Sequence, residues 1–184
     1  MSSRLVPTAF VGGAHGAWRV TVQSAVAGPA LPDVAAITVA DGGVATPEPL
    51  WTLRGVASHL RYTSRQEREE LVQRQEGLGR PESSCAAMIP LRKSAAWWAL
   101  AQDERRRIMV DSSQHFGVGM RYLPAIARKL YHSRDLGEDF DFITWFEYAP
   151  QHAVAFDELL RALRTTEEWH YVDREVDFRM VRAQ

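Results

Sequence analysis

The chain has 184 residues, of which 46% are hydrophobic and 24% are charged, which is typical of a globular protein with a sizeable core. Its 22 basic and 23 acidic residues are balanced, so composition points to neither a nucleic-acid-binding surface nor a charged tail. No apolar run approaches the roughly 20 residues that span a bilayer, and the N-terminus lacks the sustained apolar region of a secretory signal. The lone Cys85 excludes a disulfide framework and a cysteine-based zinc site. We therefore expect a cytoplasmic protein.

The first half of the chain is predicted to consist mainly of strands. Trp18, Val20 and Val22 alternate with polar residues, which is the period of a half-buried strand. A short strand near residues 36–39 and a longer one over residues 50–62 follow. The sequence Ser-Arg-Gln-Glu at residues 64–67 fits a capping box and predicts a helix that continues to about residue 75, before a Gly- and Pro-containing turn.

The second half alternates between strands and helices. Residues 85–91 are apolar and predict a strand, in which Pro90 indicates an edge or a strand end. Ser94 is expected to cap a short helix, and Asp103 a second one that runs through Ser113 and His115 and ends before Pro124. The remaining predicted elements are a strand at 126–133, a turn at 135–138, a strand at 140–148, a helix at 151–164 and a last strand at about 172–180.

This order predicts an α+β fold. Residues 60–64 and 146–150 are weakly similar, and each run lies between a strand and a helix. The repetition suggests two ferredoxin-like halves, each an antiparallel sheet covered by helices. We expect one domain over residues 1–184, with a shortened N-terminal half at about 1–93 and a C-terminal half at about 94–184.

Six histidines are candidates for metal binding, but none forms a closely spaced pair, so a multi-histidine zinc site is not expected. One histidine is nevertheless enough for haem, because the porphyrin supplies four of the iron ligands. His115 lies in a predicted helix among apolar neighbours and is either a structural histidine or such a ligand.

Arg128 is the second candidate, because alternation places it on the same face as Ile126 and Leu130. A guanidinium on an apolar face is costly unless it is paired or functional. It therefore forms a salt bridge or acts as an anion clamp in a dry pocket. Taken alone, the residues predict an α+β domain with an apolar pocket and leave the reaction open.

Several runs of sequence resemble the chlorite dismutase family of haem b proteins, and in particular its short, dimeric branch. They cover the chain from about Trp18 to the C-terminus and comprise residues 75–82 (QEGLGRPE), 90–98 (PLRKSAAWW), 102–106 (QDERR), 122–128 (YLPAIAR), 132–137 (HSRDLG) and 142–150 (FITWFEYAP). The resemblance implies two ferredoxin-like halves, with haem b in the C-terminal one, and a homodimer.

The resemblance also implies roles for individual residues. His115 falls at the proximal iron ligand, Glu168 at the carboxylate bonded to its imidazole, and Lys93 in the same network. On the other face of the haem, Arg128 falls at the distal arginine. Gln75 matches a glutamine that orients the arginine, and Trp97 and Trp98 match a tryptophan pair close to the haem. Tyr62 matches a tyrosine near the haem propionates.

The activity implied by the resemblance is that of an oxidoreductase that converts chlorite to chloride and dioxygen, with formation of the O–O bond. The alternatives are a haem peroxidase, a coproheme decarboxylase-like enzyme and a non-catalytic haem-binding or haem-sensing protein. The decarboxylase does not typically have arginine at the distal position, so Arg128 and the short chain count against it.

Overall fold

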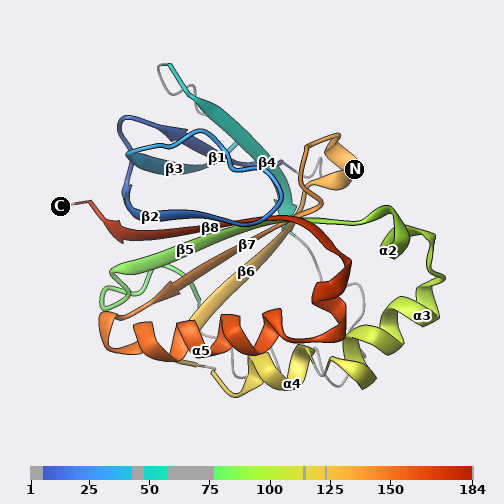
Figure 1. Ribbon diagram of the computed structural model, residues 1–184. Helices are drawn as coiled ribbons and strands as arrows, with labels where there is room; N and C mark the ends of the chain where they lie inside the picture. Colours follow the sequence, from blue (N-terminus) through green and yellow to red (C-terminus); the bar gives the residue numbers. More distant parts are fainter. Residues whose placement is uncertain (1–5, 43–47, 58–76, 114, 123, 184) are drawn as a thin grey trace, which may run out of the picture.

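The computed structural model of the protein describes residues 6–42, 48–57, 77–113, 115–122 and 124–183 (Figure 1). Eight antiparallel strands close into a barrel in the order β1-β3-β2-β8-β5-β7-β6-β4. The α+β prediction is confirmed at this level. In the described part of the chain, no helix is long and apolar enough to cross a membrane.

The barrel contains two groups of four strands with the same internal order. The first group is β1 (Thr8–Gly13), β2 (Trp18–Ala27), β3 (Ala36–Asp41) and β4 (Trp51–Ala57), arranged as β4-β1-β3-β2. The second group is β5 (Cys85–Lys93), β6 (Ile126–His132), β7 (Phe142–Tyr148) and β8 (Val172–Arg182), arranged as β8-β5-β7-β6. Numbered within its own group, each therefore has the order 4-1-3-2.

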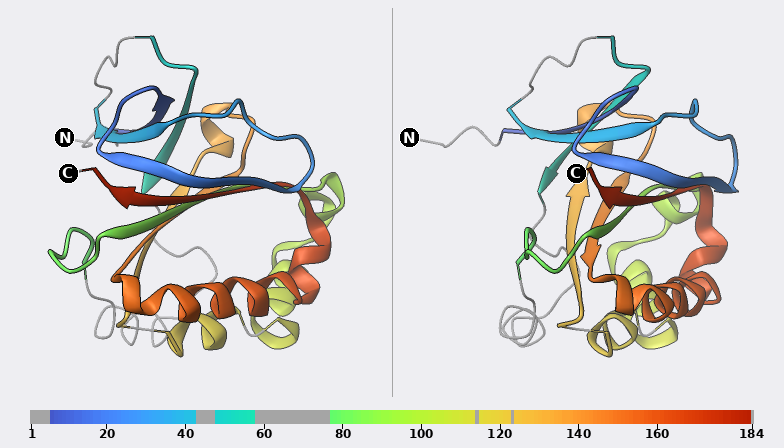
Figure 2. Two further views of the ribbon diagram at one scale, coloured as in Figure 1. Left: turned by 60° about the vertical axis from the view of Figure 1, so that its left-hand side comes forward. Right: turned by 90° about the vertical axis from the view of Figure 1, so that its left-hand side faces the viewer.

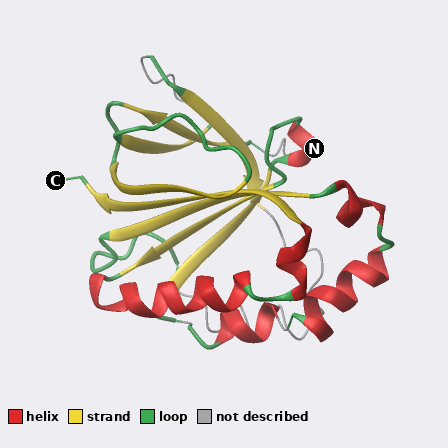
Figure 3. Cartoon of the chain, viewed as in Figure 1, coloured by secondary structure: helices red, strands yellow, loops and turns green. Residues whose placement is uncertain are grey.

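The helices lie on the side of the second group (Figures 2 and 3). Between β5 and β6 the chain forms α2 (Ala95–Ala99), α3 (Gln102–Arg107), a π-helical turn (Ile108–Ser112) and α4 (His115–Met120). A 3₁₀ turn (Arg134–Leu136) joins β6 to β7. Between β7 and β8 lie α5 (Ala153–Arg164) and two 3₁₀ turns, Pro150–His152 before it and Glu167–Tyr171 after it.

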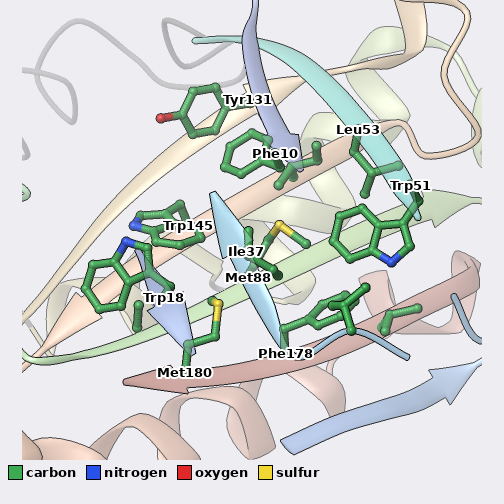
Figure 4. Close-up of a cluster of buried hydrophobic side chains, with 14 of the residues drawn as sticks. Phe10, Trp18, Ile37, Trp51, Leu53, Met88, Tyr131, Trp145, Phe178 and Met180 are labelled. Atoms are coloured by element: carbon green, nitrogen blue, oxygen red, sulfur yellow. The ribbon is translucent and has the colours of Figure 1, made fainter. Parts of the chain in front are cut away.

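Two apolar clusters hold these layers together. One fills the barrel and includes Phe10, Trp18 and Trp145, as Figure 4 shows. The other lies between the second group of strands and α5, and includes Phe146 and Phe156. Neighbours on β7 belong to different clusters because successive side chains of a strand point to opposite faces. The second group of strands is thus covered on both faces.

Most of the predicted elements are confirmed. The structure contains the strands predicted from about residues 18, 36, 85, 126, 140 and 172, and the helix predicted at 151–164. Ser94 caps α2 as expected, since its side chain accepts a hydrogen bond from the Trp97 amide. The helix predicted at 64–75, and the part of the predicted 50–62 strand beyond residue 57, lie outside the described residues.

Two local predictions are wrong. Pro90 is not at an edge, because β5 lies between β7 and β8. Proline has no backbone N–H to donate, and Pro90 lies where the pairing of β5 with β8 is interrupted, between Met88 and Leu91. Asp103 does not cap α3, which begins after Ala101. The amide of Ala101 instead donates to the carboxylate of Glu104 over 2.7 Å. A glutamate in the first turn therefore supplies the acceptor for a backbone N–H at the start of the helix.

Candidate functional site

Arg128 lies in the layer between the second group of strands and the helices. Its neighbour Ile126 belongs to the cluster under α5, and on β7 it pairs with Phe146, which belongs to the same cluster. A Cβ atom built on Gly119 of α4 would lie 4.0 Å from Nη1 of Arg128, so the guanidinium reaches α4. The structure therefore places this cation where alternation in the sequence predicted it.

Burial lowers the pKa of the Arg128 guanidinium, and the negative charge of Glu168 acts in the opposite direction and raises it. A guanidinium keeps its proton at any working pH because its ordinary pKa is above 12. The site therefore contains a permanent positive charge that is screened poorly by solvent. Such a charge attracts small anions more strongly than an exposed arginine would.

The structure places His115 at the first position of α4, and Gly119 of the same short helix lies beside Arg128. One helical turn therefore separates the backbone of the predicted iron ligand from the position that the guanidinium approaches. The predicted ligand and the predicted distal arginine thus lie on two elements that face each other across the same layer.

Lys93 and Glu168 form a buried ion pair, with 2.8 Å between Nζ and Oε1. The Lys93 ammonium also donates to the Glu168 carbonyl oxygen over 3.3 Å and lies 4.6 Å from the ring centre of Trp97. The family resemblance placed these two residues in one network, and the structure brings them into contact.

Ser113 joins this pair to the segment that carries His115. The backbone N–H of Glu168 donates to Oγ of Ser113 over 3.0 Å, and Ser113 is itself buried. Ser113 lies two residues before His115, so the turn with Glu168 and the start of α4 are directly connected. Sequence reasoning did not identify this contact, because a single serine at a helix end gives no sign of a partner 55 residues away.

The two tryptophans of the predicted pair have different surroundings. Trp97 is 1% exposed, packs against Tyr171 as well as Lys93, and its Nε1–H meets no acceptor among the described residues. Trp98 is half-buried and donates its Nε1–H to Oδ2 of Asp141 over 3.2 Å. Trp97 alone of the two therefore contacts the Lys93–Glu168 pair and presents a buried donor that a ligand could use.

Asp141 is a further residue that the sequence analysis missed. Its Oδ2 atom accepts both the Lys93 amide, over 2.7 Å, and the Trp98 indole, and its side chain is buried. It thus links the end of β5 to α2, just where Lys93 and Trp97 are positioned. An aspartate beside a predicted strand resembles any solvated acid, so no sequence signal could have identified it.

A cavity lies next to the ion pair, between the strands and α5. Its volume is about 90 Å³, and it is open to solvent on one side. Its walls are mainly apolar, and they also carry Lys93, Glu168, Arg164 and Glu175. A largely apolar pocket with a few convergent polar groups is typical of a cofactor or substrate site. Gln75 and Tyr62, the two remaining predicted site residues, lie outside the described residues.

Comparison with known families identifies the chain. The model of the chlorite dismutase family matches residues 42–183. The chain belongs to the chlorite dismutase family. This agrees with the resemblance that the sequence motifs indicated.

Individual relatives support this assignment over different lengths. The structure of a dimeric chlorite dismutase from Nitrobacter winogradskyi is 53% identical, with a TM-score of 0.90 over 96% of this chain and 99% of that one. A mutant chlorite dismutase from Candidatus Nitrospira defluvii in complex with cyanide is 21% identical, with a TM-score of 0.66 over 100% of this chain and 92% of that one, and supports the fold alone.

A curated relative matches over a shorter stretch. The chlorite dismutase of Ideonella dechloratans is 38% identical over 86 residues, which are 47% of this chain. The match spans only 28% of that relative's length.

Proposed function

We propose that the chain binds haem b in the layer between α4 and the second group of strands and converts chlorite to chloride and dioxygen. The observation that carries this proposal is the position of Arg128. It is a half-buried guanidinium whose Nη1 atom reaches the helix that begins with His115. A cation held in a poorly solvated layer suits a small anionic substrate better than an organic donor.

The residues of this layer fit a haem group. The neighbouring cavity under α5 is largely apolar, as a porphyrin site requires, and the buried indole N–H of Trp97, which does not line that cavity, lacks an acceptor among the described residues. When bound, haem supplies an iron centre that exchanges oxygen atoms and electrons with its ligands. His115 would hold the iron, and the buried, unpaired indole N–H would suit an acceptor atom brought in by the ligand.

Lys93 and Glu168 would act on His115. A histidine ligand that donates its second ring N–H to a carboxylate becomes a stronger donor to the metal and keeps one orientation. Glu168 is itself held by Lys93 at 2.8 Å, so its carboxylate keeps one position beside the pocket. This arrangement favours oxidised iron and supports an oxidoreductase.

Arg128 would act on the substrate. Its guanidinium would bind the chlorite anion, orient it and keep it within the site until turnover is complete. An oxidising species that escaped from the site would threaten the methionines of the helical layer, Met109 and Met120, whereas Met88, also a candidate from the sequence, lies inside the barrel on the other face of the sheet. Gln75 as the residue that orients Arg128, and Tyr62 and Trp98 as haem neighbours, stay predictions from the sequence.

The proposal includes an architecture of two ferredoxin-like halves and a homodimeric state. The shared 4-1-3-2 strand order supports two halves, the first of them without crossover helices in its described part. Because β5 pairs with β7 and β8, we now divide the halves before Cys85 rather than after Lys93. The similarity to a dimeric relative supports a dimer, and a cytoplasmic location stays a prediction.

An oxygen electrode tests the proposed activity. Haem-loaded wild-type protein should release one dioxygen and one chloride for each chlorite, and the protein should show the Soret absorption of haem. His115→Ala should weaken haem binding sharply. Haem uptake without oxygen release would favour the sensing or peroxidase alternative, and a protein that stays colourless when haemin is supplied would contradict the proposal as a whole.

A further inference from the structure

The turn that carries Glu168 is held on another side by a buried acid on β8. Trp169, the next residue of the 3₁₀ turn Glu167–Tyr171, donates its Nε1–H to Oε2 of Glu175 over 2.6 Å. Glu175 is only 2% exposed. Successive residues of a 3₁₀ turn differ in direction by about 120°. Trp169, held against β8, therefore directs Glu168 toward a different side, where Lys93 lies.

The same carboxylate holds the helix that leads into the turn. Arg164, the last residue of α5, donates Nε and Nη2 to Oε1 of Glu175 over 2.9 and 2.6 Å. Only residues 165 and 166 separate α5 from the turn, so Glu175 restrains both sides of this connection. Charge-assisted, two-pronged contacts of this kind are strong and directional.

In the described part of the chain, two backbone hydrogen bonds tie the turn to residues at the end of β5 and just before α4. The amide of Glu168 donates to Ser113, and the amide of Ser94 donates to the Tyr171 carbonyl oxygen over 2.7 Å. These bonds hold the backbone of the turn but leave its rotation toward or away from the pocket less restrained. The contact between Trp169 and Glu175 supplies a restraint on β8.

We propose that Glu175 is a positioning residue for the iron site: through Trp169 and Arg164 it sets the angle at which Glu168 meets the proximal side of the pocket. This inference rests on the proposed haem function. Glu175 also lines the cavity under α5, but its proposed role is indirect and passes through its hydrogen bonds to Trp169 and Arg164. Its effect passes through the hydrogen bond that Glu168 would accept from the iron-bound imidazole, whose strength sets the donor power of that ligand.

Two variants and a matched control separate this role from simple stabilisation. In the wild type, the two carboxylate oxygens of Glu175 accept hydrogen bonds from Arg164 and Trp169. Glu175→Gln leaves only one acceptor oxygen for these donors, and Trp169→Phe removes the indole N–H. Asp157→Asn is the control, since it also removes an acid that binds an arginine. Asp157 pairs with Arg179 at 2.8 Å, is about half exposed, and contacts Arg179 rather than the turn.

The first readout is hydrogen exchange in the protein as purified. Amides of residues 165–171 should exchange about tenfold faster in Glu175→Gln and by a smaller factor in Trp169→Phe, with no change in Asp157→Asn. The second readout is the reduction potential of the bound haem. Both test variants should shift it to more positive values, in the same direction as Glu168→Gln but by less, and the control should not.

The outcomes distinguish this inference from the proposed function. The positioning role is overturned if Glu175→Gln exchanges its amides at wild-type rates. It is also overturned if Glu168→Gln shifts the reduction potential while Glu175→Gln and Trp169→Phe leave it at the wild-type value. If Glu175→Gln does not fold, Trp169→Phe decides alone by the same criteria. Failure of the wild-type protein to bind haem contradicts the proposed function, whereas the exchange readout still decides whether Glu175 holds the turn.

Discussion

The two groups of four strands share a strand order but differ in what lies outside the barrel. In the first group, β4 alternates between buried and exposed residues, with Leu53 inside and Thr52 and Arg54 facing outward. In the second group, β7 is buried on both faces, since Trp145 faces the barrel interior and Phe146 faces α5. Both groups build the same interior, and only the second has a helical layer in the described structure.

The lengths of the connections explain part of this difference. Residues 14–17 join β1 to β2 and leave no room for a helix, whereas residues 94–125 join β5 to β6 and contain three. The outer face that α4 and α5 cover is where Arg128, Lys93 and Glu168 meet. The barrel therefore closes with short connections in the described part of the first group, while the proposed chemistry depends on the group with long connections.

The largest effect that the comparison predicts is on stability, at the contact between strands and helix. The ring of Phe156 on α5 is fully buried, with its centre 4.7 Å from that of Tyr148 and 5.0 Å from that of Phe146. Phe156→Ala should lower the free energy of unfolding by about 3–5 kcal/mol, because it leaves a cavity in the second cluster. Urea denaturation measures this change.

Val154 on the same helix provides the control, since it is 70% exposed. Val154→Ala should change the stability by no more than about 0.5 kcal/mol. If both variants lowered the free energy of unfolding by the same small amount, the helical layer would not be an integral part of the fold. The two groups of strands would then not differ in how they are stabilised.

The next effect concerns activity and compares two arginines on corresponding strands. Arg128 on β6 faces the helices, and Arg19 on β2, the second strand of the other group, is exposed. Arg128→Ala should keep the haem but reduce kcat/KM for chlorite by about 10²–10³-fold, the usual loss when a charge-stabilising donor is removed. Initial rates at the oxygen electrode, normalised to haem content, measure it.

Arg19→Ala should leave these rates unchanged, and Arg128→Lys should fall between the wild type and the alanine variant, because lysine keeps the charge but not the fork of donors. Wild-type rates in Arg128→Ala would show that the guanidinium has a structural role, as in the salt-bridge interpretation of the sequence.

Local sequence patterns predicted most of the strands and helices for clear physical reasons. Alternating apolar residues marked β2 and β8, and the Ser94 cap marked α2. The pattern failed at Pro90, because the position of β5 in the middle of the sheet depends on the order in which distant strands pair. It also could not show that the acids on β8 are buried, since their partner Arg164 lies on another element.

The site was less predictable than the fold. Alternation alone placed Arg128 on the apolar face of β6, and the structure agrees. The pairing of Lys93 with Glu168 joins residues 75 positions apart, so only the family resemblance could anticipate it. Ser113, Asp141 and Glu175 act through contacts that form only after the chain has folded, and each resembles an ordinary surface residue in the sequence.

A smaller effect is expected where the two groups of strands meet. Tyr131 on β6 packs against Phe10 of β1 and lies at the junction with β4. Burial, together with the negative charges of Asp41 and Glu147, raises the pKa of Tyr131 to about 12 from its ordinary value of 10.0. Between these two pH values the folded state keeps a proton that the unfolded state loses.

Stability should therefore fall as the pH rises through this window, by up to about 2–3 kcal/mol at its upper end. Urea midpoints between about pH 9 and pH 12 measure the slope, and Tyr131→Phe should remove this component. An unchanged slope in that variant would mean that the phenol is more exposed at the junction than its packing indicates.

The smallest effect is expected at an ion pair that links the two groups across the same junction. Nε of Arg54 on β4 lies 2.7 Å from Oε1 of Glu138, in the connection before β7, but the arginine side chain is 59% exposed. Arg54→Ala should therefore cost only about 0.2–1 kcal/mol, and the cost should shrink in high salt, because solvent and ions screen an exposed pair. A double-mutant cycle with Glu138→Gln isolates the pair energy from the cost of leaving the better-buried carboxylate alone. In the described residues, β4 and β6 pair at Val56–His132 and Ala57–Tyr131. A coupling much above about 1 kcal/mol that persists in high salt would show that this junction depends on the ion pair rather than on the shared apolar interior.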